Sequence, residues 1–357
     1  MFKGERIKLW TIAGIMLVCI ATVALVAASA NAKQKRPVIH IGYQPYGPYW
    51  VFQLAKEKGW WDEIGVDVTL TQFMSGIPQN YAMGKGDIDV SIMGDTPILT
   101  AAAQKTYDPV IIATLVDISN FFRVVAQPKY HDIRELKGKK FATMVGSVEN
   151  YFTMLLLEKL GWTTDDIQLI HMETKEMQAS MLAGRIDACT VVPAISFVLY
   201  GKGFSILTDK AFLSQPPGKI IDIRLYNLIV ARREWVEENP LLALKFLTVM
   251  FKGINYWLSN LEEANEWCRK KMNEALATEM TPESFAWYWG SFDVITLEKN
   301  ASEYMNPTHP GSVYANWGRE AEFLAEHGTI PAAPDIQKLL DNRLLMELWQ
   351  IKQALKD

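Results

Sequence analysis

Polar and aromatic side chains gather in four short segments of the sequence, each between a predicted strand and a predicted helix. The segments are residues 43–50, 73–78, 94–97 and 145–150. Aromatic rings supply apolar area and can hold a cation, and the free N–H groups of a helix start can hold an anion. In open α/β sheets the ligand crevice lies at the carboxyl ends of the strands. The four segments therefore predict a binding site for a small molecule.

These segments supply most of the residues that we expect to contact a ligand. The candidates are Tyr43, Gln44, Tyr46, Tyr49, Trp50, Ser75, Gly76, Gly94, Asp95, Thr96, Ser147, Glu149 and Asn150. A structural role competes with ligand contact in each segment. The aromatic residues could only pack a turn, Ser75 could only cap the helix that follows, and Asp95 or Thr96 could do the same for the next helix.

Catalytic patterns are absent from the sequence. It contains no G-x-S-x-G elbow, no Walker loop and no G-x-G-x-x-G after a predicted strand. The five histidines lack the spacing of metal ligands. Beyond residue 32 only Cys189 and Cys268 remain, and Cys189 lies in an apolar run that predicts a small buried residue. We therefore expect no enzyme activity, no cofactor and no metal.

The first 32 residues have the features of an export signal. Lys3, Arg6 and Lys8 form a positive start, an apolar stretch covers residues 9–28, and Ala30-Asn31-Ala32 offers a cleavage site. The alternative is an uncleaved membrane anchor, because the apolar stretch is nearly as long as a membrane-spanning helix. We expect a signal peptide over residues 1–32 and a periplasmic or extracytoplasmic protein, which would stay anchored if this segment were not removed.

The charge balance excludes one class of partner. The 357 residues include 36 basic and 40 acidic ones, for a net charge of −4. Nucleic-acid-binding proteins usually carry a basic surface, so we expect no nucleic acid as partner.

Short strands alternate with helices, which predicts a mostly parallel α/β sheet. The pattern runs through residues 38–115, restarts at residue 124, and meets a turn signal near residues 214–219. After a strand at residues 225–231 the chain is predicted to be helical, with helices at 240–258, 262–275, 282–290, 314–327 and 335–355. We expect lobe 1 over 37–121 plus 226–357, lobe 2 over 122–225, and a ligand cleft between them.

Several motifs resemble those of the ABC-transporter solute-binding proteins for nitrate, sulfonates and taurine, a group that also contains binders of thiamine-pyrimidine precursors. The resemblance covers residues 38–235. Its motifs are residues 41–44, 86–90 leading into 94–97, 136–140 with Gly146-Ser147, and 184–188 followed by Pro193.

This resemblance implies a type II periplasmic binding protein fold, with a hinge between two lobes and a C-terminal helical extension. It implies ligand contacts at Tyr43, Gln44, Ser75, Gly94, Asp95, Thr96, Ser147 and near Pro193. The sequence departs from the sulfonate binders in its aromatic residues at 46–50, in the acid added at Glu149-Asn150, and at residues 120–123, where the chain first crosses between the lobes. Of residues 120–123 we count Asn120 as a candidate contact. These departures favour an organic ligand with an aromatic or cationic part.

The function implied is that of the binding component of an ABC importer, a monomer that captures a small organic ligand such as a sulfonate, a taurine-like molecule or another nitrogen or sulfur compound. Its partners would be the permease and ATPase subunits at the membrane. Two alternatives remain open. One is an enzyme similar to the thiamine-pyrimidine synthases, although those carry a cysteine-rich motif that this sequence lacks. The other is a membrane-tethered ligand sensor.

Overall fold

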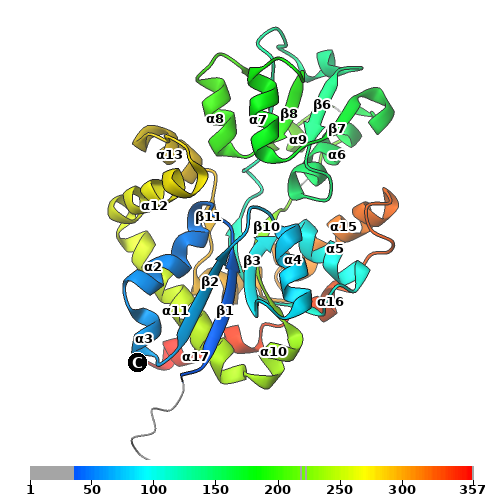
Figure 1. Cartoon of the computed structure of the whole chain (residues 1–357). Coiled ribbons are helices and arrows are strands. Elements are labelled where there is room, and N and C mark those ends of the chain that lie inside the picture. Colours follow the sequence, from blue (N-terminus) through cyan, green and yellow to red (C-terminus); the bar gives the residue numbers. More distant parts are fainter. Residues whose placement is uncertain (1–35, 218, 222, 356–357) are drawn as a thin grey trace, which may run out of the picture. The chain divides into compact units, whose positions relative to one another are not determined.

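The predicted strands assemble into two sheets, as the computed structural model shows (Figure 1). The structure describes residues 36–217, 219–221 and 223–355, so the predicted signal peptide lies outside the described residues. By its contacts the chain divides into residues 1–37 and Val38–Asp357, and both sheets belong to the second unit. The predicted α/β class is confirmed.

The first sheet mixes parallel and antiparallel strands. It holds β1 (Val38–Tyr43), β2 (Asp67–Gln72), β3 (Val90–Gly94), β4 (Pro109–Asp117), β10 (Tyr226–Arg232) and β11 (Asp293–Val294), in the order β11-β4-β10-β3-β1-β2. β1 runs parallel to β2 and β3, whereas β10 runs antiparallel to β3 and β4. The amino end of β10 therefore lies beside the carboxyl end of β3, where Asn227 pairs with Gly94.

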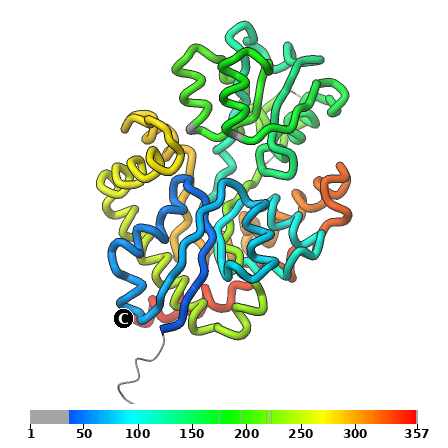
Figure 2. Tube along the Cα trace, in the orientation of Figure 1, coloured from blue at the N-terminus to red at the C-terminus, as the bar shows by residue number. Residues whose placement is uncertain are grey.

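The second sheet is built in the same way. It holds β5 (Arg123–Ala126), β6 (Lys140–Thr143), β7 (Gln168–His171), β8 (Ala188–Val191) and β9 (Ser205–Thr208), in the order β7-β6-β8-β5-β9. β6 runs parallel to β7 and β8, and β5 runs antiparallel to β8 and β9. The chain enters this sheet after β4 and leaves it before β10, so two segments connect the sheets (Figure 2).

Helices flank both sheets. Those of the first part are η1 (Gly47–Trp50), α2 (Val51–Glu57), α3 (Trp60–Glu63), α4 (Gly76–Lys85) and α5 (Asp95–Gln104). Those around the second sheet are η2 (Ile133–Leu136), α6 (Val148–Leu160), η3 (Thr164–Asp166), α7 (Thr174–Leu182), α8 (Pro193–Tyr200) and α9 (Lys210–Ser214). The C-terminal extension holds α10 (Arg233–Glu238), α11 (Pro240–Ser259), α12 (Leu261–Leu276), α13 (Pro282–Trp289), α14 (Leu297–Lys299), η4 (Asn300–Tyr304), α15 (Val313–Glu326), α16 (Ile336–Leu339) and α17 (Arg343–Ala354).

The C-terminal extension confirms most predicted helices and corrects one. The predicted helix 335–355 is broken into α16 and α17, because Leu340 forms a β-bridge with Ile111 and the N–H of Asp341 donates to the carbonyl of Ile111. α11 is long and apolar enough to span a membrane by length and composition. However, it packs against α2 and α17 and buries Phe246, Leu247 and Met250, so it forms part of the core of this unit.

Candidate functional site

One pocket is lined by loops from both sheets. It encloses about 590 Å³ of empty space, part of which is open to solvent. From the first sheet and its flanking segments come Gln44, Tyr46, Tyr49, Met74, Ser75, Gly76, Gly94, Pro97, Ile118, Phe121, Phe122 and Asn227, and from the second come Met144, Ser147, Val148, Glu149 and Val192. Most of these loops converge because they follow parallel strands, whose carboxyl ends share one edge of a sheet.

The aromatic loop after β1 is fixed by close packing. Gly47 has a φ of 46°, and a Cβ on it would lie 2.8 Å from the ring of Phe292, so glycine is required there. The N–H of Gly47 lies 3.4 Å from the sulfur of Met272, and its carbonyl accepts the thiol of Cys268 at 3.5 Å. These contacts of Gly47 with α12 hold the loop in place, and Tyr46 and Tyr49 of the same loop line the pocket.

A buried chain of hydrogen bonds holds Gln44. Its amide nitrogen donates to Gln79 at 2.7 Å, and Gln79 donates to the hydroxyl of Ser91 at 2.5 Å. Ser91 in turn donates to the carbonyl of Gly42 at 3.0 Å. Because Gln79 and Ser91 are fully buried, this chain limits the orientations open to the Gln44 amide at the pocket.

Four helices begin at residues that line the pocket. Their N-caps are Ser75 for α4, Gly94 for α5, Ser147 for α6 and Val192 for α8. The first-turn N–H groups of such helices carry a partial positive charge. A Cβ on Gly94 would lie 2.6 Å from the side chain of Val148, so glycine allows the starts of α5 and α6 to approach closely.

The caps of these helices agree only in part with the predicted ones. Ser75 is the N-cap of α4 by position but makes no side-chain capping bond, and α5 is capped by Gly94 rather than by Asp95 or Thr96. Ser147 does cap α6, since its hydroxyl accepts the N–H of Asn150 at 3.3 Å and donates to the carbonyl of Met144 at 2.6 Å.

Glu149 is the charged residue of the pocket lining. It is 8% exposed, and burial raises the pKa of its carboxyl, with a further rise from the nearby negative charge of Glu173. The negative charge of Glu149 contributes to the raised pKa values of Tyr46 and Tyr49, after the larger effect of their burial, so the two phenols lie near this carboxyl.

Eight of the predicted contact residues line the pocket, and seven lie elsewhere. Gln44, Tyr46, Tyr49, Ser75, Gly76, Gly94, Ser147 and Glu149 are in the lining, whereas Tyr43, Trp50, Asp95, Thr96, Asn120, Asn150 and Pro193 are not.

Five of these seven residues lie in ring contacts, at helix starts or at the surface. The rings of Tyr43 and Trp50 meet edge to face at 5.6 Å, and Trp50 also packs on Trp267. Asn120 is exposed, and its carbonyl accepts the guanidinium of Arg123. Asn150 is buried in the first turn of α6, and Pro193 follows the lining residue Val192.

Asp95 and Thr96 take part in a network behind the pocket. The Asp95 carboxylate accepts the N–H of Tyr226 at 2.7 Å and that of Thr96 at 3.0 Å. The Thr96 hydroxyl donates to Glu320 of α15 at 2.5 Å. All three side chains are buried, so Asp95 and Thr96 bind the protein itself in this structure.

Sequence reasoning missed several lining residues. Asn227 lies at the pocket because β10 is antiparallel, a direction that the sequence does not state. Its amide directly before the apolar run Leu228–Ala231 was the available signal. Phe121 and Phe122 line the pocket where the chain first leaves the first sheet, next to the residue that was predicted, Asn120. Phe121 packs on Tyr288 and Phe292, which anchors it to the C-terminal extension.

Metal and thiol chemistry find no support at this site. Among the described residues, no group of three or more His, Cys, Asp or Glu could hold a metal ion. Cys189 and Cys268 are free and buried, as predicted for Cys189, and burial raises the pKa of both thiols. A raised pKa keeps a thiol protonated and poorly reactive.

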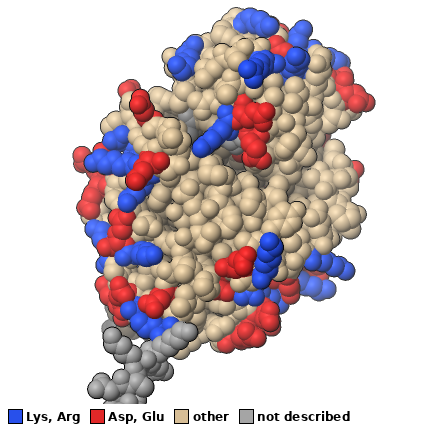
Figure 3. Space-filling view, viewed as in Figure 1, with Lys and Arg blue, Asp and Glu red and all other residues tan. Residues whose placement is uncertain are grey.

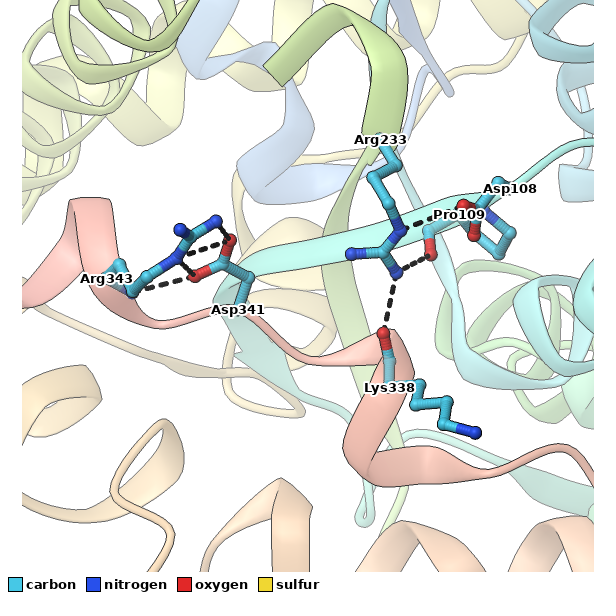
Figure 4. Close-up of polar contacts among 6 residues, drawn as sticks. All are labelled: Asp108, Pro109, Arg233, Lys338, Asp341 and Arg343. Atoms are coloured by element: carbon cyan, nitrogen blue, oxygen red, sulfur yellow. Dashed lines mark hydrogen bonds and ion pairs between the residues drawn. The ribbon is translucent and has the colours of Figure 1, made fainter. Parts of the chain in front are cut away.

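A larger cavity, with about 940 Å³ of empty space, lies at the opposite ends of the strands, beside the start of β4. Its charges have partners within the chain (Figure 4). Arg233 donates to Asp108 and to the carbonyls of Pro109 and Lys338, and Arg343 pairs with Asp341 at 2.7 Å. We interpret this cavity as part of the contact between the C-terminal segment and the first sheet. The pocket between the two sheets is therefore the candidate site.

Comparison with known proteins identifies a family and several relatives. The family model described as NMT1/THI5 like matches residues 50–264. A Bacillus subtilis protein named for binding aliphatic sulfonates is 27% identical over 262 residues, which cover 70% of this chain and 75% of the relative. The taurine-binding periplasmic protein of Escherichia coli is 23% identical over 293 residues, which cover 79% and 85%.

A solved structure shares the fold. The periplasmic aliphatic sulphonate-binding protein of Escherichia coli aligns with a TM-score of 0.67 at 20% identity, over 85% of this chain and 92% of that one. The periplasmic binding protein fold, predicted from the motifs, is therefore confirmed.

Proposed function

This chain belongs to the NMT1/THI5-like family, and on that premise we propose that it is the extracytoplasmic solute-binding component of an ABC importer. It captures a small organic ligand in the pocket between its two sheets. The observation that carries this proposal is the pocket lining, which combines strand-end loops of both sheets around a mostly apolar space.

Ligand capture works by closure of two lobes. We take lobe 1 as residues 37–121 plus 226–357 and lobe 2 as residues 122–225. The ring centroids of Phe197 in α8 and Trp287 in α13 lie 5.6 Å apart, and those of Tyr151 in α6 and Phe323 in α15 lie 5.3 Å apart. Residues of both lobes therefore also meet outside the pocket. A ligand that touches both lobes stabilises the closed arrangement relative to the open one.

The relatives support the class of ligand and partner. Their names specify aliphatic sulfonates and taurine, so a sulfonate, a taurine-like molecule or another small nitrogen or sulfur compound is the ligand class that we propose. A membrane permease with its ATPase subunits would bind the closed form and take up the ligand released from it. We propose that the protein acts as a monomer.

Binding without chemistry is the role that the relatives favour over an enzyme, since they are named as binding proteins. The thiamine-pyrimidine-synthase alternative needs a cysteine-rich motif, and the cysteines beyond residue 32 are two buried thiols. The sensor alternative would depend on residues 1–32 staying as an anchor, and these lie outside the described residues.

A melting-temperature screen tests the proposal. The exported protein is heated with sulfonates, nitrate, amino acids, pyrimidines, quaternary amines and aromatic acids. A ligand that binds only the native state must raise the melting temperature, and we expect at least one organic class to do so. Gln44→Ala should reduce the rise, whereas Gln53→Ala, on α2 and outside the lining, should keep it. If no class raises the melting temperature, the receptor proposal fails.

A further inference from the structure

The charge of the pocket lining is negative. Within the part of the chain that the structure describes, Glu149 is the only charged residue among the lining residues. The remainder are aromatic, aliphatic and sulfur-containing side chains, glycines, hydroxyls and amides. A site for a simple anion would gain from an arginine or lysine, and the lining as described has neither.

The Glu149 carboxylate lacks a cation partner among the described residues. On the face shown in Figure 3, basic and acidic side chains lie close together, and ion pairs such as Lys271 with Glu57 are common at the surface. Among the ion pairs of the described chain, none includes Glu149. The Ser147 hydroxyl and the N–H of Glu149 itself lie near the carboxyl and favour its ionised form.

Among the described groups that shift the pKa of Glu149, none is positively charged. Tyr46 and Tyr49 lie near it in the pocket lining, and Glu173 adds a second negative charge from the start of α7. In the adjacent loop, the ring of His171 accepts the N–H of Val145 at 3.0 Å. The guanidinium of Arg123, the first residue of β5, donates to the backbone carbonyls of Asn120 and Phe122.

The unpaired Glu149 carboxylate favours a positively charged ligand over a negatively charged one. An unpaired carboxylate loses hydration when it is buried, and an opposite charge brought next to it offsets that loss. An anionic ligand would add repulsion, so that it could bind well only with Glu149 protonated. Tyr46, Tyr49, Phe121 and Phe122 surround the same space with aromatic rings, which attract organic cations.

We propose that Glu149 selects ligands that carry a protonated nitrogen next to an apolar or aromatic group. This inference rests on the proposed function and narrows it. Any acidic group of the same ligand would lie at the helix starts of α4, α5 or α8, and plain sulfonates, sulfate and nitrate would be excluded.

Matched probes that differ only in the nitrogen test this proposal. The pairs are 2-aminoethanesulfonate with 2-hydroxyethanesulfonate, and benzylamine with benzyl alcohol, titrated calorimetrically into the exported protein near neutral pH. We expect the amine of a pair to bind at least about tenfold more tightly than its hydroxyl partner, because a desolvated charge pair is worth that much or more. Glu149→Gln should reduce this ratio to about threefold or less.

Two controls separate ligand selection from damage to the fold. Glu173→Gln removes an exposed acid outside the lining and should keep the amine preference. Glu149→Gln removes an unpaired buried charge, so the melting temperature of the ligand-free protein should stay equal or rise. If that variant does not fold, the pH profile of the wild-type protein decides, because amine binding should weaken as falling pH protonates Glu149, whereas anion binding should tighten.

The outcomes are distinguishable. Equal or tighter binding of the hydroxyl partners or of simple anions, with Glu149→Gln unchanged, overturns the charge selection but leaves a receptor. The absence of binding by every probe and by every compound of the melting-temperature screen overturns the receptor proposal together with this one.

Discussion

Two junctions between a strand and a helix meet at the pocket, and they place an acid in opposite settings. At the end of β3, Asp95 follows Gly94, is fully buried and accepts the N–H of Tyr226. Beyond the end of β6, Glu149 follows the cap Ser147 by two residues and lines the pocket, with no cation beside it among the described residues. The first acid is used by the fold, and the second is the one that we propose binds a ligand.

The difference comes from distant parts of the chain. The backbone N–H that Asp95 binds belongs to β10, and Glu320 of α15 closes over the same helix start through Thr96. Glu149 instead lines the pocket, near Tyr46 and Tyr49. A small residue near an acid at a strand end therefore predicts a polar helix start. Whether that acid stabilises the fold or lines the pocket depends on which later part of the chain packs against it.

Replacing Asp95 is expected to have the largest effect on stability. Asp95→Ala removes the acceptor of two buried N–H groups, those of Tyr226 and Thr96. We expect the free energy of unfolding to fall by about 3 kcal/mol, since buried donors left without partners are costly. Urea denaturation measures the loss, and Glu149→Gln serves as the comparison, with little loss expected. A fall below about 1 kcal/mol for Asp95→Ala would contradict its structural role.

The buried pair of Asp95 and Glu320 should make stability depend on pH. Burial raises the pKa of Asp95 to about 7 and raises the pKa of Glu320 well above its usual value. A carboxyl with a higher pKa in the folded state binds its proton more tightly there. Its contribution to stability is therefore complete below the unfolded pKa, about 4, and is lost as the pH rises through about 7.

Glu320→Gln should flatten this decline. A tenfold difference in proton affinity between the folded and unfolded states is worth about 1.4 kcal/mol, so we expect removal of one of the two carboxyls to lessen the fall in the free energy of unfolding between about pH 4 and 7 by at least that amount. Denaturation series at several pH values provide the measurement. Glu322→Gln, an exposed position on the same helix, should keep the wild-type slope. An unchanged slope in Glu320→Gln would show that the pair does not titrate in this range.

Local patterns were sufficient to predict much of the fold and part of the site. Alternating strands and helices identified the α/β class, and the segments at the carboxyl ends of β1, β3 and β6 supplied Gln44, Gly94 and Ser147 to the pocket. The α/β class is confirmed, and these residues lie in the pocket lining because the position of a segment at a strand end is a local property.

The remaining contacts depended on tertiary structure. Asn227 needed the direction of β10, and the inward position of Phe121 needed its packing on α13 and Phe292. Asp95 matched the family motif, but it lies outside the pocket lining because it accepts the N–H of Tyr226 and interacts with Glu320. Sequence spacing does not contain these long-range contacts, so the candidate site could be outlined but not completed.

The smallest expected effect compares two serines at helix starts. Ser147 makes a capping bond to the N–H of Asn150, whereas Ser75 holds the same position on α4 without such a bond. We expect Ser147→Ala to lower the free energy of unfolding by about 1 kcal/mol, and Ser75→Ala to lower it by less than about 0.5 kcal/mol. Urea denaturation of the ligand-free variants measures both. Equal losses would mean that Ser75 also caps its helix in solution, which would leave its hydroxyl engaged and remove the reason to expect it to bind a ligand.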